Sequence, residues 1–238
     1  MDGRVALVTG ASGGIGAAIA RRLAAAGAHV ALGYGAGRER AEALRDELGG
    51  RAVAVGADLR DPAAPGELAD AVEAQLGPVE VLVANAGMGE RRTLDAVSLE
   101  DWDATLNVNL RAPFLLAQRT VPGMRERGWG RVLLMSSVAA ATGGLVGPHY
   151  AASKAGLDGL VHFIAAREAA HGITANALAP ALIEDTAMLP GDPGDLAERI
   201  PVRRLGRPDE VADLALAVLG NGYMTGQVIG IDGGMHPR

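Results

Sequence analysis

The sequence predicts a doubly wound α/β fold, with a seven-stranded parallel sheet covered by helices on both faces, in a single domain over residues 1–238. Short apolar runs alternate with helical stretches along the chain, which is typical of parallel strands joined by helical crossovers. Runs such as VLVA at 81–84 are apolar on both faces, as expected where helices cover both sides of a sheet. No change of composition divides the chain into two domains.

Each predicted strand is a short run of Val, Ile, Leu or Ala, from RVALVT near the start to QVIGI near the end. Strands are expected at residues 4–9, 29–34, 52–57, 79–84, 131–136, 173–178 and 227–231, and helices at 15–26, 38–48, 63–76, 99–127, 150–170 and 208–219. Pro113 predicts a bend inside the fourth helix, because proline lacks an N–H for the helix ladder. The stretch 189–201 is rich in Pro, Gly and Asp, and predicts a mobile substrate flap at about 184–203.

Composition excludes several classes of function. The chain has no cysteine, so disulfides, thiolate catalysis and Cys-ligated zinc are ruled out, and its five histidines lack the spacing of a metal site. A net charge of −6 with 3% aromatic residues disfavours nucleic acid and anionic membranes as partners. No apolar run reaches the ~18 residues of a membrane span. We therefore expect a soluble cytoplasmic protein.

The segment TGASGGIG at 9–16 joins the first predicted strand to the first helix. Its glycines allow a tight turn and close approach of the backbone to a pyrophosphate, and the helix start supplies free N–H groups. This Rossmann-type position predicts dinucleotide binding by Gly10, Ser12, Gly13, Gly14, Ile15 and Gly16. The alternative is an ordinary glycine-rich loop.

The end of the second strand favours NADP(H) over NAD(H). It reads Leu-Gly-Tyr-Gly around Tyr34, without the acidic residue that usually binds the ribose 2′-hydroxyl of NAD. Arg38 and Arg40 follow, and guanidinium groups suit a 2′-phosphate. Glu39 between them and the absence of a basic residue at Gly13 count against NADP(H). The alternative role for both arginines is a solvated helix start.

Lys154 is the only lysine among 22 basic residues, and it follows Tyr150 by four positions on one helix face. A tyrosine with a pKa of about 10 is a poor acid–base catalyst near neutrality. Lowering it by ~3 units requires about 4 kcal/mol, which a cation ~4 Å away supplies at an effective dielectric constant of ~20. Lysine is a compact point charge that can also bind ribose hydroxyls, whereas arginine is a broad fork. The alternative is chance survival of one lysine in an arginine-rich chain.

Two further polar residues fit such a site. Ser137 ends the fifth strand, at the sheet edge where these folds bind ligands, and its hydroxyl can polarise a substrate carbonyl. Asn109, in the long fourth helix, could hold a water that links the lysine to solvent. Its alternative role is to cap a kink near Pro113.

These residues together resemble the short-chain dehydrogenase/reductase family along essentially the whole chain. The matching segments are TGASGGIG, Asp58-Leu59, Asn85-Ala86-Gly87, Asn109-Leu110, Ser137, Tyr150-Ala151-Ala152-Ser153-Lys154 and the final Ile231-Asp232-Gly233-Gly234. The resemblance implies catalysis by Tyr150 as general acid, Lys154 as its activator and ribose ligand, Ser137 as carbonyl donor and Asn109 as relay anchor. It also implies cofactor binding by Asp58, Leu59, Asn85, Ala86, Gly87, Pro180, Ile183 and Thr186, and a homotetramer.

Within the family the chain is most similar to the 3-oxoacyl-(acyl-carrier-protein) reductases of fatty acid biosynthesis. The similarity implies a 3-oxoacyl thioester substrate and an acyl carrier protein as partner. The chain departs from that pattern at Ala181, in the length of the segment before Thr186 and in the short link GNGYMTG. His171 stands where those reductases carry a carrier-docking arginine, which leaves three other arginines, Arg125, Arg127 and Arg131, as docking candidates or as a solvated face.

The expected substrate pocket is lined by small or apolar residues. Its predicted lining is Met88, Ser137, residues 139–145 from Ala139 onward, His149, Tyr150 and residues 182–189. The absence of an arginine clamp predicts a neutral ketone or thioester. His149 is either a polar contact for the substrate or a wall or interface residue.

Three functions remain open at this point. The first is reduction of a ketone by NADPH, with a 3-oxoacyl thioester as the preferred substrate. The second is reduction or oxidation of another small ketone, alcohol, sugar or secondary metabolite. The third is a non-catalytic dinucleotide sensor, which the set of Ser137, Tyr150 and Lys154 argues against because a sensor needs no proton donor.

Overall fold

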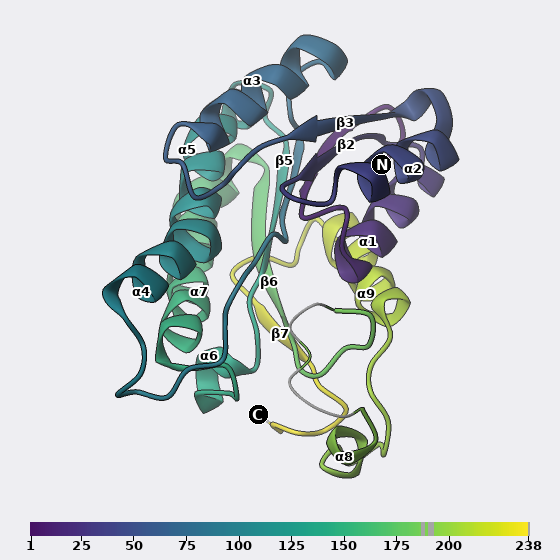
Figure 1. Ribbon diagram of the computed structural model, residues 1–238. Coiled ribbons are helices and arrows are strands. Elements are labelled where there is room, and N and C mark those ends of the chain that lie inside the picture. The colour runs from purple at the N-terminus through teal and green to yellow at the C-terminus, as the bar shows by residue number, and fades with distance from the viewer. Residues whose placement is uncertain (187–188, 190–192, 238) are drawn as a thin grey trace.

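In the computed structural model, which describes residues 1–186, 189 and 193–237, seven strands form one parallel sheet. The sheet order is β3-β2-β1-β4-β5-β6-β7, so the chain runs outward in both directions from β1 (Figure 1). The strands are β1 (Val5–Thr9), β2 (His29–Tyr34), β3 (Ala52–Gly56), β4 (Val81–Ala84), β5 (Gly130–Met135), β6 (Ile173–Pro180) and β7 (Val228–Ile231). The predicted doubly wound fold is confirmed, and each strand lies within two residues of its expected bounds.

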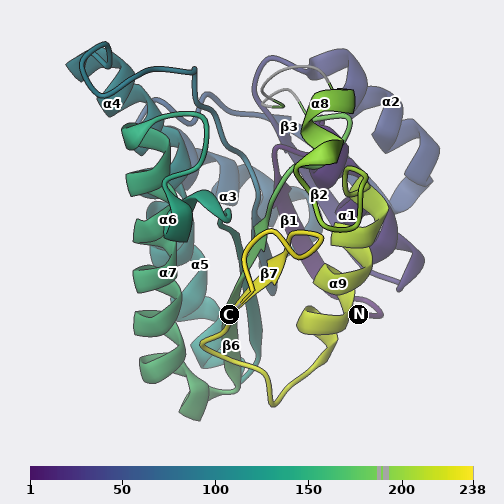
Figure 2. The same ribbon diagram turned by 90° about the horizontal axis from the view of Figure 1, so that it is seen from below.

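Helices cover both faces of this sheet (Figures 1 and 2). One face packs against α1 (Gly14–Ala25), α2 (Arg38–Leu48) and α9 (Pro208–Gly220), and the other against α3 (Ala64–Leu76), α5 (Ala112–Glu126) and α7 (Pro148–Glu168). Successive strand residues point to opposite faces, so Leu133 belongs to the first core and Leu134 to the second, both with no exposed surface. This is why the strands read as continuous apolar runs.

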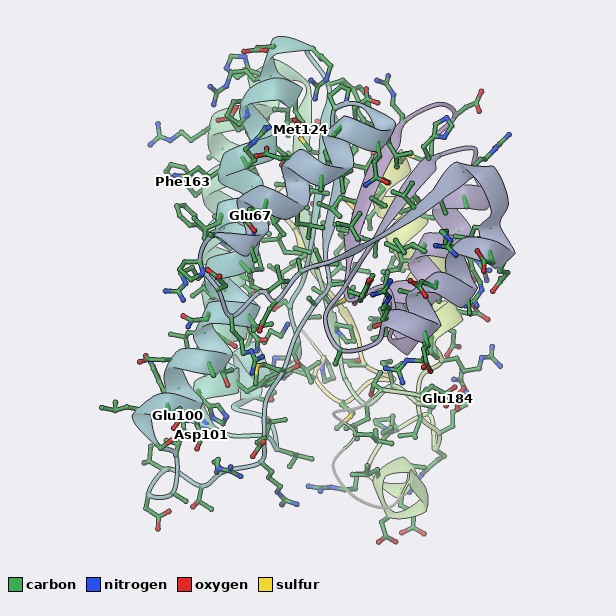
Figure 3. The ribbon with its side chains drawn as sticks, turned by 45° about the horizontal axis from the view of Figure 1, so that its top comes forward. Glu67, Glu100, Asp101, Met124, Phe163 and Glu184 are labelled. Atoms are coloured by element: carbon green, nitrogen blue, oxygen red, sulfur yellow. The ribbon has the colours of Figure 1, made fainter. Side chains whose placement is uncertain are left out.

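The predicted fourth helix is interrupted. It consists of α4 (Leu99–Leu106), a π-helical turn at Asn107–Arg111, and α5. Pro113 lies in the first turn of α5, where proline is tolerated, and the wider π-turn immediately before it replaces the expected bend. The start of α4 is fixed by Ser98 and Asp101, which form a capping box; Figure 3 shows Asp101 beside Glu100 at this end.

Three further segments gather at the carboxyl ends of the strands. They are the short helices α6 (Ala139–Thr142) and α8 (Pro193–Glu198), neither of which was predicted, and the C-terminal tail, which Figure 2 shows between them. Within the predicted flap at 184–203, residues 187, 188 and 190–192 lie outside the described residues. Among the described residues, no helix is long and apolar enough to cross a membrane.

Two glycines of α7 test how tightly this helix packs. A Cβ at Gly159 would meet nothing within 4 Å, whereas one at Gly156 would lie 2.7 Å from Cδ2 of Leu110 in the π-helical turn. We expect Gly159→Ala to raise the free energy of unfolding by about 0.5–1 kcal/mol, because alanine favours helix. Gly156→Ala should be about 1 kcal/mol less stable than Gly159→Ala, because Leu110 must move. Urea unfolding of both variants measures this; equal stabilisation would contradict the packing.

Candidate active site

The glycine-rich segment after β1 forms a tight turn that other parts of the chain approach closely. Gly10 has φ of +66°, and a Cβ there would lie 2.9 Å from Cα of Ala86. A Cβ at Gly16 would collide with the carbonyl oxygen of Gly10. The Asn85 amide donates to the carbonyls of Thr9 (3.0 Å) and Gly10 (3.3 Å), which ties the turn to the end of β4. Because these positions are glycines, no side chain fills the space beside the turn. A pyrophosphate can therefore lie directly against its backbone.

The turn also contacts the segment that follows β6. A Cβ at Gly14 would lie 2.7 Å from the carbonyl oxygen of Asp185. The backbone of Asp185 has a positive φ of +57°. Ser12, Gly13, Gly14 and Thr186 line one shallow cavity with Asp185. The first residues of the predicted flap therefore rest on the predicted phosphate site.

A second cavity, next to the turn, is lined by most of the residues expected around the adenosine half of the cofactor. Its walls include Gly10, Tyr34, Asp58, Leu59, Ala86, Gly87 and Met88. The Asp58 carboxylate is paired with Arg60 (2.7 Å), and this hydrogen bond lowers the pKa of Asp58 from its ordinary 3.8 to about 2. The carboxylate is thus ionised at neutral pH and available at the cavity rim as an acceptor.

The two arginines proposed for a 2′-phosphate differ in their surroundings. Arg38 is 73% exposed and its Nε donates to the Glu42 carboxylate (2.9 Å) along the same helix. Nε of Arg40 donates to the carbonyl of Ser12 in the glycine turn (3.0 Å), and the rest of its guanidinium makes no hydrogen bond or ion pair within the described part of the chain. Arg40 therefore lies beside the glycine turn with guanidinium N–H donors that are free for a ligand, whereas Arg38 is engaged by Glu42.

Ser137, Tyr150 and Lys154 line one cavity of about 360 Å³ at the carboxyl edge of the sheet. Ser137 follows β5 by two residues, and Tyr150 and Lys154 lie in the first two turns of α7. All three are buried, and Nζ of Lys154 donates to the carbonyl of Met135 at the end of β5 (2.7 Å). A Cβ at Gly89 would lie 2.9 Å from the Tyr150 ring, so Gly89 leaves room for that ring.

Burial dominates the ionisation of this pair. It raises the pKa of Tyr150, which a hydrogen bond with the Ser137 side chain partly offsets, and it lowers the pKa of Lys154 from 10.5 to about 8. Nζ of Lys154 lies 5.6 Å from the Tyr150 ring centre and is bonded to the strand. The pKa of Tyr150 is therefore raised by burial, and not lowered as expected from one nearby cation, in the protein without its cofactor.

Asn109 lies in the π-helical turn and is fully buried. Its Oδ1 accepts from the N–H of Met88 (2.8 Å), while Nδ2 donates to the Met88 carbonyl (2.8 Å) and to Ser153 Oγ (3.0 Å). Both amide donors are used, which leaves one acceptor position on Oδ1 for a water. A Cβ at Gly87 would lie 3.4 Å from Nζ of Lys154 and 3.5 Å from Oδ1 of Asn109, so the two groups flank the same glycine.

The segment after β6 forms the opposite wall of the catalytic cavity. Pro180, Ile183 and Thr186 all line it, together with Ile15 from α1. The Thr186 hydroxyl donates to the carbonyl of Ile183 (2.8 Å), and Ile183 pairs with Gly206 in an isolated parallel bridge. The backbone of Ile183 is thus held against the cavity, as its expected cofactor contact requires.

The lining of the cavity differs in part from the predicted one. Ala139, Thr142, Gly144, Leu145 and Leu189 line it as expected. Met88 instead lines the adenosine-side cavity, because Asn109 holds its backbone there. His149 is fully buried, outside the lining, and neither ring nitrogen has a hydrogen-bond partner among the described residues.

Several lining residues were not predicted individually, among them Arg199, which lies within the predicted flap, and Met235 and His236. Arg199 follows α8, and the other two lie in the C-terminal tail. No sequence motif pointed to them, because the flap and the tail reach the cavity only through tertiary packing. The expectation that no arginine faces the substrate is corrected by Arg199.

The arginines suggested for carrier docking lie at the other edge of the sheet, where β5 begins. The Arg125 guanidinium makes two hydrogen bonds with the Glu168 carboxylate (2.9 and 2.6 Å). Arg127 donates to the carbonyl of Val79 (3.1 Å), and the buried Arg131 donates to backbone carbonyls. These residues stabilise the end of the fold where β5 begins, whereas the catalytic cavity lies at the carboxyl edge of the sheet, and carrier docking by them stays a prediction.

The lowered pKa of Lys154 predicts a dependence of stability on pH. Between about pH 8 and 10.5 the unfolded chain still binds a proton that the folded protein has released, so stability rises with pH in this window. Relative to Lys154→Met, the wild-type free energy of unfolding should rise by about 2 kcal/mol between pH 7.5 and 9.5. The raised pKa of Tyr150 acts only above pH 10. Parallel urea titrations measure this difference; identical pH profiles would contradict it.

Comparison with known proteins agrees with this geometry. A family model described as short chain dehydrogenase matches residues 4–193. The chain is 37% identical to 3-oxoacyl-(acyl-carrier-protein) reductase FabG of Escherichia coli K12, over 99% of this chain and 98% of that one. It is 40% identical to acetoacetyl-CoA reductase of Rhizobium meliloti, over 98% of both chains.

Among solved structures, a blue fluorescent protein from a metagenomic library, crystallised in complex with NADPH, superposes with a TM-score of 0.93 at 40% identity, covering 99% of both chains. The match of the family model over most of the chain, the full-length relatives and the common fold lead to one conclusion: this chain belongs to the short-chain dehydrogenase family and is a dinucleotide-dependent oxidoreductase acting on carbonyl or hydroxyl groups.

Proposed function

We propose that this protein uses NADPH to reduce a ketone, with a 3-oxoacyl thioester as the preferred substrate class. The observation that carries the proposal is the single cavity that Ser137, Tyr150 and Lys154 share with the segment after β6. The relatives named for acetoacetyl-CoA and 3-oxoacyl-carrier reduction support the thioester. The likeness to an NADPH complex and the position of Arg40 support the cofactor.

The residues of the chain fit such a cofactor from end to end. The glycine turn receives the pyrophosphate, the cavity with Asp58 and Ala86 receives the adenosine, and Ile183 lies against the nicotinamide side of the catalytic cavity. When bound, the reduced nicotinamide supplies the hydride. Lys154 offers its ammonium to the ribose hydroxyls, since Nζ uses one donor on Met135 and keeps two.

The proton is handled by the protein. Because burial raises the pKa of Tyr150, its phenol stays protonated at neutral pH and can give its proton to the substrate oxygen as the carbonyl is reduced. The Ser137 hydroxyl donates to the same oxygen and polarises it. The positive charge of Lys154 then stabilises the tyrosinate, and the free acceptor position on Asn109 can hold a water of the relay that returns a proton.

Further parts of the proposal rest on fewer observations. Of the predicted flap at 184–203, the described residues Thr186, Leu189 and Arg199 line the cavity, which supports a role of this part of the segment in contacting the substrate. The chain forms a homotetramer in the cytoplasm; the exposed rings of Phe114 on α5 and Phe163 on α7, the latter projecting outward in Figure 3, support an interface on that side. A small ketone or alcohol is the second candidate substrate, supported by the small size of the cavity.

Two substitutions test the catalytic assignment. Tyr150→Phe removes the proton donor, so turnover of acetoacetyl-CoA should fall at least about 100-fold while the affinity for NADPH stays within about twofold. Lys154→Arg keeps a charge but cannot fit the lysine's place against Met135, so turnover should fall at least about tenfold. Absorbance of NADPH and its fluorescence on binding give both quantities. Turnover by Tyr150→Phe at the wild-type rate would refute the proton-donor role.

A second pair of variants tests the phosphate contact. Arg40→Ala removes a guanidinium held at the glycine turn, so NADPH affinity should fall about tenfold, the scale of one charged hydrogen bond, with little change for NADH. Arg38→Ala is the matched control, because Glu42 already engages that side chain, and should alter both affinities less than twofold. Fluorescence titration measures all four constants. Equal losses of NADPH and NADH affinity would remove Arg40 from the phosphate site.

A further inference from the structure

The lining of the catalytic cavity is unusual in its charges. Acidic residues make up 28 of the 238 in the chain, against 22 basic ones. The residues around the cavity nevertheless include Lys154, Arg199 and His236, and no Asp or Glu is among its described lining. Lys154 is the catalytic candidate and is bonded to the strand. Arg199 and His236 have no role in the reaction described above, so their presence requires another explanation.

The two side chains come from segments that pack on one another. A Cβ at Gly233 would lie 2.6 Å from Cγ2 of Ile200 and 2.8 Å from Cγ2 of Val202, and the N–H of Val202 donates to the carbonyl of Gly233 (3.3 Å). Arg199 directly precedes this contact in one segment, and His236 follows it by three residues in the other. The contact therefore joins the two segments that carry these side chains, and both side chains line the cavity.

Both segments are held in place. Leu196 and Ile200, on either side of Arg199, are 5% and 2% exposed, and the N–H of Arg199 donates to the carbonyl of Leu196 (3.1 Å). In the tail, the Asp232 carboxylate accepts from the N–H groups of Gly234 (2.9 Å) and His236 (3.1 Å). The backbone at each residue is thus fixed, and only the side chains are left to meet a ligand.

Arg199 is exposed, and its guanidinium has no partner within the described part of the chain. It makes no hydrogen bond or ion pair with any residue that the structure describes, although most other arginines here are paired with carboxylates. Glu198, which directly precedes Arg199, and Asp195 form no ion pair with it and do not line the cavity; Glu184 and Asp185 line the glycine-turn cavity, and Asp232 lines a separate small one. A cation at a cavity wall that makes no ion pair with the described residues is suited to an anion from outside the protein.

We propose that Arg199 and His236 form a subsite for an oxyanion carried by the substrate at the end away from its ketone. The proposal rests on the reductase function above and narrows its substrate class from neutral ketones to anionic ones. The guanidinium offers a fork of donors that matches a carboxylate or a phosphate, and the imidazole adds one N–H. The anion is either the carboxylate of a short oxo acid or the phosphate of a phosphopantetheine thioester.

Matched substrate pairs distinguish the two sources. Acetoacetyl-phosphopantetheine and acetoacetyl-pantetheine differ only in the phosphate. The members of the second pair, 5-oxohexanoate and its methyl ester, differ in the charge of the carboxyl group and in one methyl group. One of the two pairs carries the anion that the subsite binds. For the charged member of that pair, Arg199→Gln should lower kcat/KM at least tenfold by raising KM. For its neutral member, the same variant should lower kcat/KM less than twofold. Arg199→Lys should recover part of the loss, and His236→Gln should lose a smaller factor.

Arg203→Gln is the control, since it removes the same charge four residues away without touching the cavity. Calorimetric binding of phosphopantetheine and of glutarate to the NADPH-loaded enzyme gives a readout that does not depend on turnover. Loss of anion binding in Arg199→Gln, but not in Arg203→Gln, would support the subsite even if none of these ketones is reduced. Three results would each overturn the subsite. They are equal losses of kcat/KM for the charged and the neutral substrate, unchanged anion binding in Arg199→Gln, and a loss of NADPH affinity without a change in substrate selectivity.

Discussion

The burial of one ammonium group organises the centre of this molecule. Lys154 is enclosed by the end of β5, the glycine at 87 and the π-helical turn, and within the described residues its ammonium makes one hydrogen bond, to the Met135 carbonyl. Keeping a charge there is costly, which is the reason for its lowered pKa. The cost is tolerated because a compact cation with two remaining donors lies beside the tyrosine at the sheet edge. An arginine fork would not fit between Gly87 and β5.

Close backbone approach is the second constraint, and glycine provides it at each point. Gly10 and Gly16 bring the turn against Asn85 and Ala86, and Gly14 admits the carbonyl of Asp185. Gly89 makes room for the Tyr150 ring. Each contact brings a segment from the carboxyl end of a different strand to one edge of the sheet. Close packing of the backbone therefore sets the shape of the catalytic cavity, and the side chains supply its chemistry.

The sequence allowed the sheet to be predicted almost completely, because strands covered on both faces are short apolar runs. It also pointed to Tyr150 and Lys154, since a four-residue spacing on a helix is a local relation. Relations between distant segments were not predictable. Arg38 and Arg40 were indistinguishable until the structure paired Arg38 with Glu42 and brought Arg40 to Ser12.

Burial was the other property that sequence reasoning did not supply. The attraction of a cation was expected to lower the pKa of Tyr150, yet burial raises this pKa and the hydrogen bond with Ser137 offsets the rise only in part. His149, next in the chain to Tyr150, was expected at the pocket and is enclosed behind it. Arg199 and His236 reach the cavity from segments without regular repeats, for which periodicity carries no information.

The most direct test of the buried-ammonium account uses the fact that the chain has one lysine. Protein labelled with carbon-13 at lysine Cε gives a single lysine signal, and its chemical shift reports the protonation of Nζ. Titration of the folded protein should give a midpoint at about pH 8. A midpoint at or above the ordinary 10.5 would mean that Lys154 is solvated or paired with an anion, and would contradict the account of how this site is built.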